Sequence, residues 1–145
     1  MIEPTSLAVT RLDNIYANLE AIRARVGSRL VLAAVKADAY GHGAVAVSWM
    51  IQESKAADWL GVATVGEGLE LRAAGITMPI LKLSMTRHPE ETLAAVANSI
   101  TLTVTDTTSI VAAAAAALNA GVVADVHLKI DTGMRRIGCA PEQAV

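Results

Sequence analysis

The residue types best suited to chemistry in this chain gather in two short segments. The first, residues 34–44, reads A-V-K-A-D-A-Y-G-H-G-A and places Lys36 directly after an apolar run. In parallel α/β folds, reactive groups collect at the carboxyl ends of the strands, and a lysine amine there suits Schiff-base chemistry. Tyr40 adds a phenol, while Gly41 and Gly43 let backbone N–H groups approach an anion such as a phosphate. The segment therefore indicates an amine-dependent site beside an anion-binding turn.

Two other interpretations of this segment remain open on spacing alone. A lysine at a strand end can extend its ammonium group into water without any chemical role. Residues 41–46 also fit G-x-G-x-x-A, the dinucleotide-binding fingerprint. That fingerprint places its first glycine directly after the strand, whereas residues 36–40 intervene here, and no acid ends the second predicted strand. The dinucleotide interpretation is therefore the weaker one.

The second segment, residues 127–138, reads H-L-K-I-D-T-G-M-R-R-I-G. A single-lobe aspartic protease subunit also presents its catalytic carboxylate in D-T-G after an apolar strand, and Asp131 would take that place. That fold is all-β, whereas this chain is rich in helical spacing, which argues against a protease. Arg135 and Arg136 are either a solvated charge pair or include a fixed cation beside a cofactor oxygen.

The helices and strands that must position these two segments are visible as alternating helical and strand-like patterns. Apolar residues recur at helical spacing from Leu12 to Val26, between a Thr10 cap and Gly27. The unbroken apolar run at 30–35 predicts a strand buried on both faces. Further helices are expected at 44–53, at 66–74, from His88 onward, and between an Asp106 cap and Gly121; further strands are expected at 59–63, 80–83, 100–104 and 122–130. This alternation predicts parallel strands with right-handed crossovers, in a doubly wound sheet or a barrel.

Composition excludes several classes of protein. The 145 residues include 12 basic and 14 acidic side chains, so the formal net charge is −2, and there is no basic run. We therefore expect no nucleic-acid partner and no charge-driven membrane contact. Residues 107–124 carry no charge, but their alanines and polar residues argue against a membrane helix. The single cysteine, Cys139, and three scattered histidines offer no metal-ligand spacing, which fits a reducing, cytoplasmic setting.

Taken together, the two segments resemble the alanine racemases, fold-type III enzymes that depend on pyridoxal 5′-phosphate (PLP). Residues 61–76, G-V-A-T-V-G-E-G-L-E-L-R-A-A-G-I, are similar to that family's second strand and following helix, so the resemblance covers nearly the whole chain. It implies an α/β fold that forms part of a (β/α)8 TIM barrel, with about the first five strands and their helices. Residues 1–145 would then be the N-terminal portion of the PLP-binding barrel domain, without the C-terminal β-domain. The implied activity is interconversion of L-alanine and D-alanine, which supplies D-alanine for the bacterial cell wall.

The resemblance also assigns roles to residues at matching positions. Lys36 would hold the cofactor covalently and then act as a base on one face of the substrate. Tyr40 would hydrogen-bond the cofactor phosphate, and Leu83 would line the cofactor ring. Arg136 would approach the cofactor's phenolic oxygen and contact the substrate, while Lys129, carbamylated in some members of the family, would position that arginine.

Racemisation needs two acid–base groups on opposite faces of the substrate, and the resemblance supplies only one of them from this chain. The other would be a tyrosine in the C-terminal domain of the partner subunit of a homodimer, so we expect the 145-residue chain alone to be inactive. Two alternatives stay open. One is a PLP-binding or structural remnant without turnover, and the other is a related racemase whose amino-acid substrate is serine or lysine.

Overall fold

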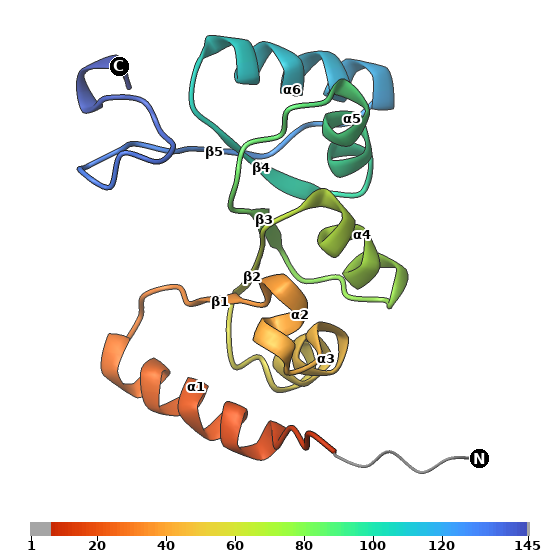
Figure 1. Cartoon of the computed structure of the whole chain (residues 1–145), viewed down its shortest axis with the longest axis vertical. Helices are drawn as coiled ribbons and strands as arrows, with labels where there is room; N and C mark the ends of the chain where they lie inside the picture. The colour runs from red at the N-terminus through yellow and green to blue at the C-terminus, as the bar shows by residue number, and fades with distance from the viewer. Residues whose placement is uncertain (1–6, 145) are drawn as a thin grey trace.

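The computed structural model describes residues 7–144, in which helices and strands alternate as the sequence pattern predicts (Figure 1). The strands are β1 (Leu32–Ala34), β2 (Trp59–Val62), β3 (Ile80–Lys82), β4 (Ile100–Val104) and β5 (Val126–Leu128). The helices are α1 (Leu12–Val26), α2 (Lys36–Gly41), α3 (Ala44–Ser54), α4 (Val65–Ala73), α5 (Pro89–Ala97) and α6 (Thr107–Ala120), followed by the 3-10 turn η1 (Pro141–Gln143). This succession confirms the α/β class.

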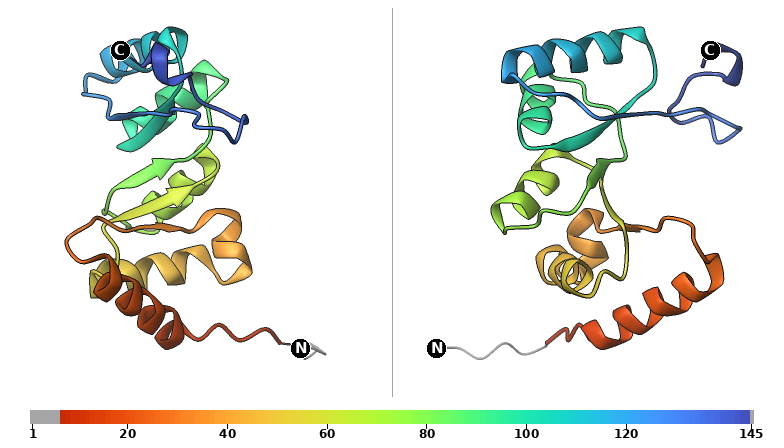
Figure 2. Two further views of the ribbon diagram at one scale, coloured as in Figure 1. Left: turned by 90° about the vertical axis from the view of Figure 1, so that its left-hand side faces the viewer. Right: turned by 180° about the vertical axis from the view of Figure 1, so that it is seen from behind.

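The five strands form one parallel sheet in the order β1-β2-β3-β4-β5. Each strand therefore pairs with its neighbours in sequence, as in a barrel wall, whereas the strand order of a doubly wound sheet reverses at a switch point. Helices α3 to α6 lie on one side of the sheet, and the segment after β5 extends on the other side (Figures 1 and 2). This topology confirms the first five strands of a TIM barrel and excludes the doubly wound alternative.

A contact across the inner face shows how strongly the sheet curves. The rings of Trp59 on β2 and His127 on β5 lie 5.3 Å apart between centroids. In a flat sheet, the three strand spacings between β2 and β5 would separate their backbones by about 14 Å. Curvature brings the two side chains together, so the face opposite the helices is concave.

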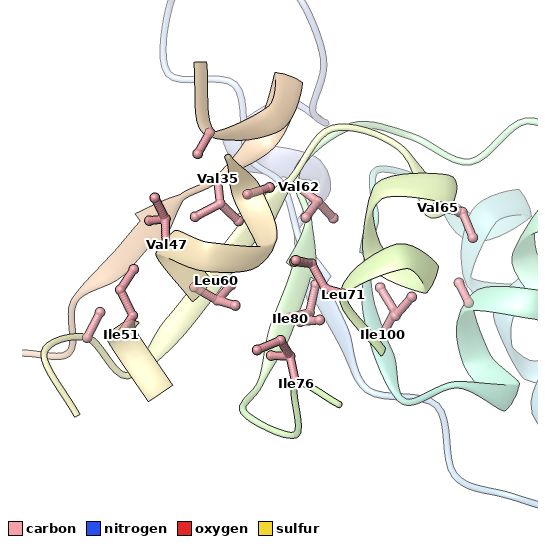
Figure 3. Close-up of a cluster of buried hydrophobic side chains, with 14 of the residues drawn as sticks. Val35, Val47, Ile51, Leu60, Val62, Val65, Leu71, Ile76, Ile80 and Ile100 are labelled. Atoms are coloured by element: carbon pink, nitrogen blue, oxygen red, sulfur yellow. The ribbon is translucent and has the colours of Figure 1, made fainter. Parts of the chain in front are cut away.

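The core lies between the sheet and its helices (Figure 3). Leu60, Ile80 and Ile100 point from neighbouring strands toward helix residues such as Ile51 and Leu71, and all five side chains are buried. These side chains are aliphatic, as expected for a chain in which 3% of residues are aromatic. The helices therefore cover the face of the sheet that carries these aliphatic side chains. The concave face is left free for a site.

Arg72 ties together the loops at the amino ends of β3 and β4. It lies in the last turn of α4, and its guanidinium donates hydrogen bonds to four backbone carbonyl oxygens. The acceptors are Ile76 at 2.8 Å, Met78 at 2.9 Å, Asn98 at 3.0 Å and Ser99 at 2.8 Å. One side chain therefore fixes the loop before β3 against the loop before β4.

The first and last strands differ from expectation. The strand expected at 30–35 with both faces buried is wrong in extent and burial, because β1 covers three residues and Leu32 is 38% exposed. The strand expected at 122–130 is likewise reduced to β5, whose residues are exposed. Both are edge strands with a single neighbour, so one side of each lacks the pairing and packing that the apolar pattern anticipated.

Of the two helix caps expected from the sequence, one is present in the structure and one is not. The expected Asp106 cap is confirmed, because its Oδ1 accepts a hydrogen bond from Ser109 N at 2.7 Å, and Gly121 ends α6 with φ of 68°. The Thr10 cap is wrong: Arg11 is the N-cap of α1 and makes no capping side-chain bond. Over residues 7–144, no helix combines the length and the apolar character that a bilayer crossing requires.

Candidate functional site

A cavity of about 410 Å³ opens at the carboxyl ends of the strands. Its lining includes Lys36 after β1, Ala63 after β2, Leu83 after β3 and Lys129 after β5. The carboxyl ends of parallel strands meet at one edge, which is why residues so distant in sequence surround one space. The rest of the lining consists of Ser84, Met134, Arg136 and Ile137. Four of the five residues predicted from sequence therefore share this cavity, while their roles stay predictions.

The lining combines basic and apolar side chains. Lys36, Lys129 and Arg136 are basic, whereas Leu83, Met134 and Ile137 are among its apolar members, and none of the lining residues is acidic. Lys36 and Leu83 are half-buried, while Lys129 and Arg136 are exposed, so the cavity is open to solvent. Such a set suits an anionic ligand with a flat apolar part.

Tyr40, the fifth predicted residue, lies beside the cavity and not in its lining. Its side chain is 62% exposed, and its ring centroid lies 5.8 Å from Lys36 Nζ. That separation is within the range of a cation–π contact. The phenol therefore lies close enough to Lys36 for both to act on one bound molecule.

The backbone between Lys36 and Gly41 adopts a conformation that the sequence pattern did not predict. Ala37, Asp38, Ala39 and Tyr40 form a left-handed turn, with φ between 51° and 56°. Each such residue costs roughly 1–2 kcal/mol, because Cβ crowds the following carbonyl oxygen. The apparent dinucleotide fingerprint is thus wrong in context: its first glycine follows this turn and the sheet lacks a reversal in strand order.

Hydrogen bonds at both ends of the left-handed turn compensate for part of this strain. Ala39 N donates to Val35 O at 2.8 Å, and Gly43 N donates to Asp38 O at 3.0 Å. Asp38 Oδ1 also accepts a hydrogen bond from Ala44 N, the first residue of α3, at 2.7 Å. The turn is therefore attached to the end of β1 on one side and to α3 on the other.

Glu67 holds the entrance of this turn and was missed as a site residue. Its Oε1 accepts a hydrogen bond from Ala37 N at 2.9 Å, and its Oε2 accepts from Ala63 N at 2.7 Å and Thr64 N at 3.1 Å. Burial alone would raise the pKa of this carboxyl, but these hydrogen bonds and the nearby Lys36 ammonium outweigh it and lower the pKa. The pattern T-x-x-E at 64–67 indicates a capping box, which the structure contains, but it does not reveal the bond to Ala37.

Lys82 is a second residue whose position the sequence did not reveal. It is buried, and its Nζ donates to the carbonyl oxygens of Ser84 at 2.8 Å and Met85 at 2.7 Å. Burial lowers the pKa of this amine, and nearby Glu91 partly opposes that effect. Ser84 in turn donates its hydroxyl hydrogen to Ala63 O, so the loop after β3 is joined to the end of β2.

Asp131 organises the loop that carries Arg136. Its Oδ1 accepts hydrogen bonds from Gly133 N at 2.8 Å and Arg135 N at 3.0 Å, and the Arg135 bond contributes most to lowering the pKa of the carboxyl. A backbone bridge between Ile130 and Cys139 closes the base of the loop. The all-β protease interpretation of D-T-G is therefore wrong: the chain is α/β, and Asp131 serves a turn.

Gly138 allows that loop to close, and replacing it tests the closure. A Cβ at position 138 would lie 2.7 Å from Asp131 N and 3.0 Å from Ile130 C, both of them backbone atoms. Gly138→Ala is expected to destabilise the loop by about 1–3 kcal/mol, the scale of backbone strain at such φ values, with the clash in addition. The measurement is thermal unfolding of the purified protein.

Gly133→Ala is the matched control for that change. Gly133 has φ of 137° and Gly138 has φ of 127°, but a Cβ at position 133 would meet no atom within 4 Å. Both substitutions place an alanine at positive φ, but only Gly138→Ala brings a Cβ against backbone atoms. Equal losses of stability in both would contradict the close approach of Gly138 to Asp131.

Comparisons with known proteins agree with this geometry. Residues 10–145 match the family described as alanine racemase, N-terminal domain. An alanine racemase of Cutibacterium acnes is 52% identical over 137 residues, which are 94% of this chain and 36% of that protein. A solved alanine racemase of Clostridium difficile 630 in complex with cycloserine has a TM-score of 0.85 and 39% identity, covering 94% of this chain and 38% of its own.

A racemase named for another amino acid has the same fold. The solved histidine racemase of Leuconostoc mesenteroides has a TM-score of 0.79 and 31% identity, covering 88% of this chain and 34% of its own. The chain spans about a third of the length of the curated relatives it matches. Because the family match extends over residues 10–145 and the sheet order agrees with it, the chain belongs to the alanine racemase family.

Proposed function

We propose that this chain is the N-terminal, cofactor-binding part of a PLP-dependent racemase that interconverts L-alanine and D-alanine. The observation that carries the proposal is the half-buried Lys36 amine in a cavity of about 410 Å³ that also contains Leu83, Lys129 and Arg136. Family membership supports the same reaction, since the relatives from Cutibacterium acnes and Clostridium difficile named above are alanine racemases.

The donor set of the cavity fits PLP. Lys36 offers the amine with which an aldehyde condenses, and Arg136 and Lys129 offer positive charge to the oxygens of an anionic ligand. Leu83 supplies apolar surface for a flat ring, and Tyr40 beside the cavity offers a hydroxyl to a phosphate. When bound, PLP delocalises the negative charge that is left on Cα after a proton is removed.

In this proposal, Lys36 and Arg136 have the principal tasks. Lys36 Nζ accepts the Cα proton from one face of the amino acid, or returns it there in the reverse direction. Arg136 contacts the substrate, and its guanidinium opposes protonation of the oxygen it faces. Lys129 lies in the same cavity, and its Nζ donates to Ile130 O at 3.0 Å. In this proposal a carbamylated Lys129 carries the negative charge that positions Arg136. The second acid–base group acts on the opposite face, and we propose that a tyrosine of the partner subunit in a homodimer supplies it.

The decisive experiment is borohydride reduction of the intact gene product after incubation with PLP, followed by peptide mapping. The expected result is a stable adduct on Lys36. An adduct on Lys55, Lys82 or Lys129, or none at all, would overturn the proposal. Residues 1–145 alone are expected to show no racemisation, because the tyrosine proposed as the second acid–base group belongs to the family's C-terminal domain.

Substrate choice is a separate question, and the histidine racemase among the structural matches makes it concrete. Turnover of L-alanine by the intact gene product should exceed that of serine, lysine and histidine. Faster turnover of one of those three would assign a related racemase. Bound cofactor without turnover of any of them would favour a remnant that binds PLP.

A further inference from the structure

The strained backbone after Lys36 needs support at its entrance. Val35 is buried and Lys36 half-buried, and the four residues from Ala37 onward all have positive φ although none of them is glycine. The direction in which Lys36 leaves the strand depends on where this left-handed turn begins. A turn free to relax toward ordinary φ values would carry the Lys36 side chain with it.

The first amide of this turn, Ala37 N, donates a hydrogen bond to the side chain of Glu67. Glu67 Oε1 lies 2.9 Å from Ala37 N, the amide directly after Lys36, and comes from an element 30 residues away. Its other oxygen, Oε2, accepts from Ala63 N and Thr64 N, where β2 passes into α4. One carboxylate therefore joins the segment after β1 to the segment after β2, and both Lys36 and Ala63 line the cavity.

We propose that Glu67 is a positioning residue for catalysis, which holds the backbone of Ala37 so that the Lys36 amine stays directed into the cavity. The inference rests on the proposed role of Lys36. It goes beyond the capping box, because a helix cap needs the bond to Thr64 N and not the bond to Ala37 N. The lowered pKa of Glu67 agrees with it, since a charged carboxylate accepts stronger hydrogen bonds than a neutral acid.

Two variants of the intact gene product separate positioning from capping. Glu67→Gln keeps one carbonyl oxygen, which can serve the capping box, but its amide nitrogen cannot accept a hydrogen bond. Its single acceptor oxygen therefore cannot replace both carboxylate oxygens, one of which accepts from Ala37 N and the other from Ala63 N and Thr64 N. Thr64→Ala removes the reciprocal cap, in which Thr64 Oγ1 accepts from Glu67 N at 3.2 Å, and leaves the carboxylate in place.

The first readout is amide hydrogen exchange in the protein without PLP, which does not depend on activity. Exchange of the Ala37 amide is expected to be at least about tenfold faster in Glu67→Gln, because the hydrogen bond that protects it is lost. In Thr64→Ala the Ala37 amide should exchange as in the parent protein, while the first turn of α4 loses protection. This measurement remains informative even if Lys36 proves to bind no cofactor.

The second readout is steady-state kinetics with PLP bound. Glu67→Gln is expected to lower kcat by roughly 10- to 100-fold, with a much smaller change in KM, because a misdirected base slows proton transfer more than substrate binding. The rate of borohydride trapping at Lys36 should fall in parallel. Thr64→Ala should change the melting temperature more than it changes kcat. Glu67→Ala, which removes both oxygens, should reproduce the kinetic loss.

Three outcomes would overturn the inference. The first is an Ala37 amide that exchanges faster in Glu67→Gln while kcat and trapping stay at parental values. The second is a loss of kcat in Thr64→Ala as large as that in Glu67→Ala, which would reduce Glu67 to a helix cap. The third is unchanged Ala37 exchange in Glu67→Ala. Absence of any cofactor at Lys36 in the parent protein would instead refute the proposed function, and the exchange data would still report on the hydrogen bond.

Discussion

Replacing Lys36 by alanine in the intact gene product is expected to lower the kcat for alanine racemisation by at least about 1,000-fold. The change removes the half-buried amine from a cavity whose other basic side chains, Lys129 and Arg136, are exposed. General base catalysis alone accounts for roughly 100- to 10,000-fold in rate, and the covalent hold on the cofactor is lost as well. The measurement is the rate of change in optical rotation, or of D-alanine formation, at saturating L-alanine and PLP.

Lys36→Arg and Lys55→Ala complete this test. Lys36→Arg keeps the positive charge but offers no amine that can condense with an aldehyde, so it should be as inactive as Lys36→Ala. Lys55 is an exposed lysine after α3 and does not line the cavity, so Lys55→Ala should retain the parental rate. Substantial turnover by Lys36→Arg would contradict the assigned role of the amine.

Arg72→Ala is expected to cause the largest loss of stability among surface-accessible positions of this chain, about 3 kcal/mol or more. Its guanidinium donates to four carbonyl oxygens at 2.8–3.0 Å, and those oxygens belong to the loops before β3 and β4. A hydrogen bond to a charged donor contributes roughly 1.5–3 kcal/mol, but four bonds from one group do not add independently. Thermal unfolding should show a melting temperature lower by about 6 °C or more.

Two further variants show whether the four bonds are responsible. Arg72→Lys keeps the charge but cannot match the planar guanidinium with its several fixed donors, so it should recover only part of the stability. Arg25→Ala removes an exposed arginine from the last turn of α1 and should change the melting temperature little. Equal effects of Arg25→Ala and Arg72→Ala would mean that net charge, and not loop anchoring, governs the loss.

Most of the architecture was predictable because it depends on patterns that are local in sequence. The helix at 12–26 has apolar residues at helical spacing, and the strand at 100–104 has the predicted bounds. Parallel order then places the ends of β1, β3 and β5 at one edge, so the grouping of Lys36, Leu83 and Lys129 follows from the fold class. The residues that matched family motifs were therefore found without any knowledge of their distances.

The features that escaped prediction depend on contacts between distant residues or oppose local preference. The bond from Ala37 N to Glu67 spans 30 residues, and the bonds from Arg72 to Asn98 and Ser99 span 26 and 27 residues. No local pattern reports such pairs. The left-handed turn at 37–40 runs against the preference of Ala37, Ala39 and Tyr40, so propensity would place a different backbone there. The burial of the first strand was overestimated because its apolar pattern does not tell an edge strand from a central one.

The strand order described above also bears on how the molecule is made. Because each of the five strands in residues 7–144 bonds to its neighbours in sequence, each new β-strand and helix can dock on structure that has already left the ribosome. Paired residues lie 20 to 27 positions apart, so each pairing closes a shorter loop than pairing between distant strands would. This five-stranded wall can thus grow from β1 to β5 in the order in which the strands are synthesised.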